Sequence, residues 1–399
     1  MTLKRREYWT SAFAGFCAAL IGNGLGRFAY TPLIPALIAE NWFTASEAGY
    51  LGAANLAGYL AGALSGYATT RVARPAAIMR IMMLLTAASL FACMERGLGF
   101  AWFFLWRFVA GYTGGVLIVV GAPLLLSVTP HDRRGVVGGL MFTGVGLGIA
   151  ISGIVVPRLI GWGGLDGTWF GLGAIAFVLA LLAWNGWPAT YGRTTQAPES
   201  RSGLALPVYA LPVYALLGEY ALNAIGLVPH MLFLVDYVAR GLGRGLDAGA
   251  FDWIVFGIAA ALGPILSGRL ADAIGFRAAI LLAFCAQAMA VALPVITSAP
   301  VWIAVSSAVT GACVPGISTL ALGRIHELIG AGSTQGRAWG HATSAWAITQ
   351  ALAAYGYAYL LGKTEDYALL FEIGVAALVL AFVLELALGR PAPMNRTSS

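Results

Sequence analysis

The sequence predicts an all-α membrane protein with twelve transmembrane helices in two parallel six-helix repeats. First, 59% of the 399 residues are hydrophobic and only 10% are charged, a composition that fits neither a soluble globular protein nor a disordered chain. Second, the chain divides into apolar runs long enough for a helix to cross a bilayer, which takes about 20 residues. Third, short motifs recur at an offset close to 202 residues.

The apolar runs define the expected helices in chain order. They span 9–38, 45–69, 76–94, 100–129, 135–160, 169–187, 206–235, 250–270, 278–296, 301–322, 338–361 and 367–388. The first run follows Lys4, Arg5 and Arg6, as the core of a signal peptide does. It is too long for such a core and many further spans follow, so we keep it as the first helix.

Local signals support the second and eighth helices. Thr44 stands three residues before Glu47, the spacing of a capping box at a helix N-terminus. We expect Asp247 or Asp252 to cap the eighth helix in a similar way. The second helix also carries a face of small residues, which predicts that a neighbouring backbone lies close to Gly58, Gly62 and Gly66.

Basic residues predict the orientation. With the N-terminus inside, sixteen Lys and Arg residues lie on the inner side and five on the outer side, while Arg27 and Arg107 lie within spans. The positive-inside rule then places both termini in the cytoplasm. The one long polar stretch, 188–206, is expected to be a cytoplasmic linker between an N-terminal half (1–187) and a C-terminal half (207–399). Because the basic residues are scattered between apolar runs, no nucleic-acid partner is expected.

The internal repeat links corresponding helices of the two halves. At an offset of 202 residues, Gly24–Leu25 match Gly226–Leu227, and residues 64–66 match residues 266–268. Two parallel repeats around a cavity at the middle of the membrane are the architecture of a secondary transporter whose halves rock against each other.

Three motifs resemble those of the major facilitator superfamily. The stretch GRLADAIGFR, 268–277, is similar to the family's loop motif between helices eight and nine, and its counterpart GYATTRVAR has Thr70 where the family has Asp. The resemblance implies that an inner gate involves Asp272, Arg277 and Arg71. The stretch RFVAGYTGG, 107–115, resembles the family's fourth-helix pattern, and the glycine spacing of helix five keeps part of its antiporter motif.

The stretch NGLGRFAYTPLIPAL, 23–37, together with TASEAGYLGAANLAGYLAG, resembles the YbfB/YjiJ-like branch of that superfamily. This resemblance implies a fold and a mode of action, and it leaves the substrate open. We therefore expect a multi-pass protein of the bacterial inner membrane that is not an enzyme.

Two arginines are candidates for substrate binding. A charged side chain near the centre of a membrane helix costs about 2.5–3.5 kcal/mol, so each such residue is a functional hypothesis. Arg27 and Arg107 lie in the outer halves of helices one and four, which line the cavity in the resembled family. Paired guanidinium groups fit a carboxylate or another oxyanion. The alternative is structural: the arginines can bond carbonyls freed by Pro32 and Pro35.

Acidic groups in the seventh helix are candidates for proton coupling. Glu219 lies near its centre, where burial favours the neutral carboxyl and a nearby arginine favours the charged one. The alternative is a static ion pair with Arg27 or Arg107. His230 is expected to face the cavity and, with Asp236, to extend a proton relay, although Asp236 also fits a helix-end charge at the membrane surface.

Other polar and aromatic residues are candidates for contact with an organic substrate, although membrane interfaces and helix packing use the same residue types. These candidates are Asn23, Tyr30, Trp106, Tyr112, Asn223, His230, Trp346 and Gln350. No catalytic residue, metal site or cofactor is expected, because the sequence lacks a phosphate-binding G-x-x-x-x-G-K-[ST] loop and any Cys-x-x-Cys pair.

The predicted function is transport of a small organic solute, expected to be anionic, by proton-coupled alternating access, with protons, the solute and the lipid bilayer as partners. One alternative is efflux of drugs or metabolites by proton exchange. Others are a sensor that does not transport and, because His230 adjoins Met231, a copper carrier.

Overall fold

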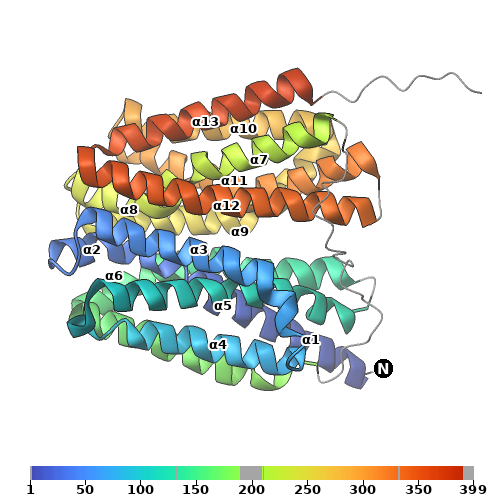
Figure 1. The fold of residues 1–399 in the computed structure, drawn as a ribbon, viewed down its shortest axis with the longest axis horizontal. Helices are drawn as coiled ribbons and strands as arrows, with labels where there is room; N and C mark the ends of the chain where they lie inside the picture. The colour runs from blue at the N-terminus through green and yellow to red at the C-terminus, as the bar shows by residue number, and fades with distance from the viewer. Residues whose placement is uncertain (1, 131–132, 189–208, 210, 331–332, 390–399) are drawn as a thin grey trace, which may run out of the picture.

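The regular structure of the described residues is helical throughout. The computed structural model describes residues 2–130, 133–188, 209, 211–330 and 333–389. The long helices run along a common axis, and α1 (Thr2–Ala19) starts at the same end of the bundle at which α13 (Tyr367–Leu388) finishes (Figure 1). We call this the terminal end and the opposite end the distal end.

The first group of helices occupies one side of the bundle, in blue to green in Figure 1. After α1 it contains η1 (Leu20–Leu25), η2 (Phe28–Leu33), α2 (Ile34–Ala39), α3 (Ala45–Thr69), α4 (Pro75–Ala92), η3 (Arg96–Leu98), α5 (Gly99–Ser127), α6 (Arg134–Leu182) and η5 (Trp184–Gly186). The backbone of α6 leaves helical geometry at Gly163 and at Gly164, where φ is +61°, so α6 consists of two arms.

The second group lies on the other side, in yellow-green to red. Before α13 it contains α7 (Leu211–Val228), η6 (Pro229–Phe233), α8 (Leu234–Asp236), η7 (Tyr237–Gly241), α9 (Leu246–Ile274), α10 (Phe276–Ile296), α11 (Pro300–Ile329) and α12 (Ser333–Thr364). Residues 189–206 of the predicted linker lie outside the described residues, so the linker stays a prediction.

Nine helical segments of the described residues are long and apolar enough to cross a membrane. One of them is the 49-residue α6, whose two arms meet at the kink. The helices α3 and α12, of 25 and 32 residues, are less apolar and run beside the others (Figure 1). The all-α membrane class is confirmed, and the number of twelve crossings stays a prediction.

Of the two predicted helix N-terminal caps, one is confirmed and one is wrong. The capping box is confirmed, because Thr44 Oγ1 accepts a hydrogen bond from the backbone N–H of Glu47, whose side chain accepts one from Thr44 N–H. The prediction that Asp247 or Asp252 caps the eighth helix is wrong. That helix, α9, begins after Gly245, whose φ of +80° turns the chain, and its N-terminus has no side-chain cap.

The small-residue face of α3 is confirmed by its packing. A side chain on Gly58 would meet the backbone of Phe108, and one on Gly62 would meet the backbone of Tyr112, so α3 and α5 pack backbone to backbone.

The first and seventh membrane segments are both interrupted. Between α1 and α2 the chain forms a π-helix at Leu20–Leu25 and a 3₁₀-helix at Phe28–Leu33, which contains Pro32. The seventh segment forms a π-helix at Pro229–Phe233. The repeat offset matches Arg27 with Pro229, so the two breaks lie at corresponding places. Proline removes a backbone donor, and such breaks expose backbone groups that side chains or ligands can bind.

The two groups pack against each other toward the distal end. A Cβ on Gly49 of α3 would lie 2.7 Å from Ala358 Cβ of α12, and the rings of Tyr50 and Tyr355 are 6.1 Å apart. Toward the terminal end, a Cβ placed on Gly135, Gly139 or Gly268 would have no described neighbour within 4 Å. The bundle is therefore closed at its distal end.

Candidate functional site

Arg27 crosses from one group of helices to the other. It lies between η1 and η2, and only 9% of its side chain is exposed. Its Nη2 donates a hydrogen bond to Gln350 Oε1 of α12 at 2.6 Å and lies 3.5 Å from Met231 Sδ of η6. Its guanidinium carbon is 4.9 Å from the ring centroids of both Phe28 and Tyr59. The cation therefore links the broken first segment to α12 and to the broken seventh segment.

This buried cation forms no ion pair within the described residues. Its Nε has no hydrogen-bond acceptor there either. The amide, the thioether and the two rings supply only partial negative charge, which compensates a desolvated guanidinium less than a carboxylate does. Arg27 is thus a positive charge that an anionic ligand can neutralise.

Arg107 has a different environment. From α5 it donates to Gly26 O at 2.9 Å and to Arg27 O at 3.5 Å, and its guanidinium carbon lies 4.2 Å from the ring centroid of Tyr30. Asn55 Nδ2 donates to Gly26 O and to Arg107 O, both at 3.1 Å. Arg107 and Asn55 therefore bind the carbonyls that the broken first segment leaves free, and in doing so they hold the backbone of Arg27 in place.

A narrow space lies beside these groups. Its wall contains Arg27, Phe28, Tyr30, Thr31, Gly52, Asn55, Leu56, Arg107, Met231 and Leu232. Both arginines of the wall have an Nε–H without a described acceptor. The wall thus presents spare donors and an excess of positive charge, which suits a small anion.

The other predicted contact residues divide into two sets. Gln350 joins Arg27 and also lies 3.7 Å from Met231 Sδ. Trp346 Nε1 lies 3.4 Å from Asn223 Oδ1, and Asn223 donates to Gln287 Oε1 at 2.7 Å. This second set links α12, α7 and α10 within one group of helices.

Four more predicted contacts lie in the first group of helices. Tyr30 Oη donates to Ala48 O at 2.9 Å, and Tyr112 Oη accepts from Ser65 Oγ at 3.3 Å. Asn23 Nδ2 and Trp106 Nε1 are buried without a hydrogen-bond partner among the residues described.

Glu219 lies away from both arginines. The charges that act on it are those of Glu385, Arg324 and Arg277, from α13, α11 and α10. The expected alternative of an ion pair with Arg27 or Arg107 is not formed. Arg324 and Glu385 were not predicted, because Arg324 follows the expected tenth helix (301–322) on the inner side and Glu385 stands near the end of the last helix. The signal available for Glu385 was a lone acid inside the apolar stretch VLAFVLELALG.

His230 and Asp236 are enclosed by other side chains. His230 Nε2 lies 2.6 Å from Ser306 Oγ, which itself donates to Ala290 O at 2.6 Å. Since Ser306 uses its proton there, His230 donates through Nε2–H and is held inside its own group of helices rather than facing the other one.

Asp236 is fully buried, in contrast to a helix-end charge at a membrane surface. Arg240 donates to its two oxygens at 2.6 and 2.8 Å, and Tyr367 Oη also donates to it. This carboxylate has both a bidentate cation and a hydroxyl donor, so its charge is well compensated.

The family model described as "Uncharacterised MFS-type transporter YbfB" matches residues 19–386. The chain belongs to this branch of the major facilitator superfamily. It is a multi-pass membrane protein and a secondary transporter, not an enzyme. No curated protein matches it.

Two solved structures share the fold over nearly the whole chain. A crystal structure of a D-xylose-proton symporter aligns with a TM-score of 0.72 at 14% identity and covers 97% of this chain and 100% of the other. A mutant of the nucleoside transporter NupG aligns with a TM-score of 0.78 at 12% identity and covers 95% and 100%. Identities this low show a common fold and leave the substrate of this transporter open.

The expected gate residues of this transporter do not meet. Asp272 and Arg71 are exposed, and Asp272 forms no ion pair with any other described residue. Arg277 instead donates to the carbonyls of Glu385 and Leu386 at the end of α13, at 3.0 and 3.2 Å. Asp272 thus has no latch partner in a conformation closed at the distal end. No group of three potential metal ligands occurs in the parts of the chain that the structure describes.

Proposed function

We propose that this transporter carries a small organic anion across the bacterial inner membrane in a proton-coupled cycle, with both termini in the cytoplasm. The observation that carries the proposal is Arg27, a buried cation that bridges the two groups of helices and has no acidic partner among the described residues. The spare donors of Arg27 and Arg107 support an anionic rather than a neutral solute.

Binding at Arg27 would act directly on the closed distal end. An oxyanion competes with Gln350 Oε1 for the guanidinium and offers charge-assisted hydrogen bonds, which are stronger than the bond to a neutral amide. The link from Arg27 to α12 and Met231 is then weakened, and the two groups are free to separate. Arg107 and Asn55 keep the carbonyls of Gly26 and Arg27 bonded during this exchange.

Proton coupling has an electrostatic reason. Moving one negative charge toward a negative interior costs about 2.3 kcal/mol for each 100 mV of membrane potential. A proton that travels with the anion cancels this charge. We assign the proton to Glu219, because it is a fully buried carboxyl whose oxygens lack hydrogen-bond donors among the described residues.

The alternative of efflux by proton exchange has little support from geometry. It rested on the glycine spacing of the fifth helix, and these glycines serve packing. A Cβ on Gly148 would meet Gly24 Cα, and one on Gly153 would lie 2.7 Å from Ile254 Cγ1. The positions are therefore accounted for by close helix contacts.

The decisive experiment uses purified protein and a panel of small solutes. We expect monocarboxylates or dicarboxylates to raise the apparent Tm in detergent, and D-xylose and nucleosides to leave it unchanged. In liposomes, a stabilising carboxylate should then accumulate when a pH step is imposed.

Arg27→Gln should remove the stabilisation by carboxylates. The matched control is Arg96→Gln, since Arg96 is an exposed cation stacked on Trp42 at 5.4 Å and hydrogen-bonded to Asn41 O. Stabilisation by carboxylates that survives Arg27→Gln would refute an anion site at Arg27.

A further inference from the structure

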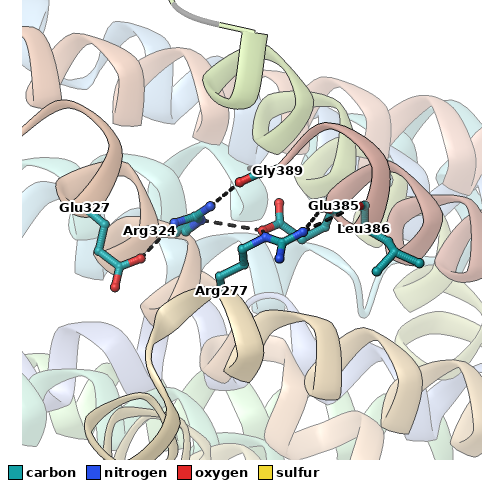
Figure 2. Close-up of polar contacts among 6 residues, drawn as sticks. All are labelled: Arg277, Arg324, Glu327, Glu385, Leu386 and Gly389. Atoms are coloured by element: carbon teal, nitrogen blue, oxygen red, sulfur yellow. Dashed lines mark hydrogen bonds and ion pairs between the residues drawn. The ribbon is translucent and has the colours of Figure 1, made fainter. Parts of the chain in front are cut away.

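A second group of charges lies at the terminal end between α7, α10, α11 and α13. Figure 2 shows four of its members, Arg277, Arg324, Glu327 and Glu385, and Glu219 of α7 completes it. We call these five residues the terminal cluster. It belongs to one group of helices only and lies outside the space beside Arg27.

The two arginines of the terminal cluster are engaged with α11 and α13 through their terminal nitrogens. Arg324 donates to Glu327 Oε2 at 2.9 Å and to Gly389 O, and its Nε lies 3.5 Å from Glu385 Oε1. Arg277 donates to the carbonyls of Glu385 and Leu386, and its Nε lies 3.3 Å from the same carboxylate oxygen. Both guanidinium groups therefore neutralise Glu385 and cap the C-terminus of α13 (Figure 2).

Glu219 is left without a donor. Its side chain is 0% exposed, and neither of its oxygens receives a hydrogen bond from an N–H or O–H group of the described residues. The helices α7 and α13 pack closely, since a side chain on Gly226 would meet Leu378 and a Cβ on Gly374 would lie 3.4 Å from Gly226 O. This packing places Glu219 beside the carboxyl of Glu385, with Arg324 and Arg277 also acting on it. Two adjacent buried carboxylates repel strongly in a low-dielectric interior unless one of them holds a proton.

We propose that Glu219 and Glu385 share one proton and form the proton-binding site of this transporter. The proton sits on one carboxyl oxygen and is donated to an oxygen of the other carboxyl, so the pair carries one negative charge in place of two. The arginines position Glu385 and neutralise that remaining charge. This inference deepens the proposed function and rests on it for the role of the proton in transport.

Titratable groups also come from the other helices packed against Glu219 and Glu385. Glu385 of α13 lies against Arg324 of α11 and Arg277 of α10, and Arg324 in turn pairs with Glu327 of α11. Glu327 is 36% exposed and is paired with Arg324. On α12, His341 Nδ1 lies 3.1 Å from Tyr209 Oη, before the start of α7, and is not among the charges acting on Glu219. Glu219 and Glu385 are therefore the two like charges that repel each other when both are ionised.

The helix that carries Glu219 also reaches the anion site. Met231 follows Glu219 by twelve residues, about 18 Å along a helix. Its carbonyl accepts a hydrogen bond from Thr31 Oγ1 at 2.8 Å, and its sulfur contacts Arg27. Loss of the shared proton would push α7 away from α13 at one end, while the other end of the same segment holds the distal closure. The proton site and Arg27 are thus joined by one helical segment.

The test is an infrared pH titration of the purified, full-length protein, with no added solute. We expect a carboxylic-acid C=O band that disappears as the pH rises, and that is absent from Glu219→Gln. Glu385→Gln should remove the band at neutral pH as well, since Glu219 then becomes the acid that pairs with the arginines. Glu327→Gln is the matched control and should keep the band.

A second measurement covers the case in which a substituted carboxyl alters folding. A proton bound only in the folded state makes stability fall as the pH rises, by about a tenfold change in the unfolding constant per pH unit for one proton. The apparent Tm of the wild type should therefore decline with pH, and that of Glu219→Gln should not. If the carboxylic-acid C=O band and the decline of the apparent Tm with pH both persist in Glu219→Gln, the assignment of a shared proton is wrong.

Further outcomes separate this inference from the proposed function. Stabilisation by Na⁺ over K⁺ at equal ionic strength, lost in Glu219→Gln, would make the pair a sodium site and overturn the proton assignment. If carboxylates accumulate under a pH step in wild type and equally in Glu219→Gln, the pair of Glu219 and Glu385 is not the coupling site although the anion transporter stands. If the band titrates as expected while no carboxylate binds, the proton site stands and the anion proposal fails.

Discussion

The distal region around Arg27 and the terminal cluster both contain two buried or half-buried arginines, yet their charges are balanced in opposite ways. At Arg27 and Arg107 the cations bind carbonyls, an amide and aromatic rings, and no carboxylate pairs with them among the described residues. At the terminal cluster, Arg277 and Arg324 bind Glu385, and a second carboxyl, Glu219, receives no hydrogen bond from any residue that the structure describes.

The difference indicates which region binds a negatively charged ligand and which binds a positively charged one. A region with spare positive charge favours an anion, and a region with spare negative charge favours a cation, here a proton. The two imbalances lie in different halves of the chain, and the segment from α7 to η6 connects them. Substitutions at the two regions should therefore have different effects on stability and on binding.

The largest effect is expected at Arg324. Arg324→Leu leaves Glu385, which is 1% exposed, without one of its two cations, and removal of one partner of a buried ion pair costs about 3–5 kcal/mol. The apparent Tm in detergent should drop sharply. The double variant Arg324→Leu/Glu385→Leu should recover part of the loss, and no recovery would show that Arg324 acts chiefly on Gly389 O.

A smaller loss is expected at Arg107. Arg107→Leu leaves the carbonyls of Gly26 and Arg27 with fewer donors, which costs about 1–3 kcal/mol for a buried acceptor. Binding of carboxylates should weaken together with the fall in apparent Tm, because the damage is to the backbone that carries Arg27. A selective loss of carboxylate binding at unchanged Tm would show direct ligand contact by Arg107.

Arg27 should behave in the opposite way. Arg27→Leu removes an uncompensated buried cation, so we expect stability to be unchanged or higher by up to about 1 kcal/mol while binding of carboxylates is lost. Thermal melts with and without a stabilising carboxylate measure both effects. A destabilisation as large as that of Arg324→Leu would break the contrast between the two regions.

The smallest effect is expected at Glu327. Its ion pair with Arg324 is part-exposed, and such pairs contribute roughly 0–1 kcal/mol. Glu327→Gln should leave the apparent Tm and proton-driven uptake close to those of the wild type. A strong loss of uptake would extend the proton site beyond Glu219 and Glu385.

Several features of the fold were predictable because local patterns specify them. The apolar runs marked most helices, with α3 at Ala45–Thr69 and α13 at Tyr367–Leu388 placed at the same bounds. The α3 cap followed from Thr44 and Glu47, and the close approach of a neighbouring backbone to α3 followed from glycine spacing, although the neighbour, α5, was not predicted. The start of α9 was missed because the left-handed backbone of Gly245, rather than an aspartate, begins that helix.

The sequence by itself determined that this is a helical membrane transporter with buried charges, because hydrocarbon tolerates neither an unpaired backbone nor many ions. Only the tertiary structure decided which charges meet. Arg27 lies against Gln350, which is 323 residues away, and Glu219 lies beside Glu385 rather than beside an arginine of the first half. Such pairings depend on how separate helices rotate and pack against one another, and helical periodicity within a single segment carries no information about its distant partner.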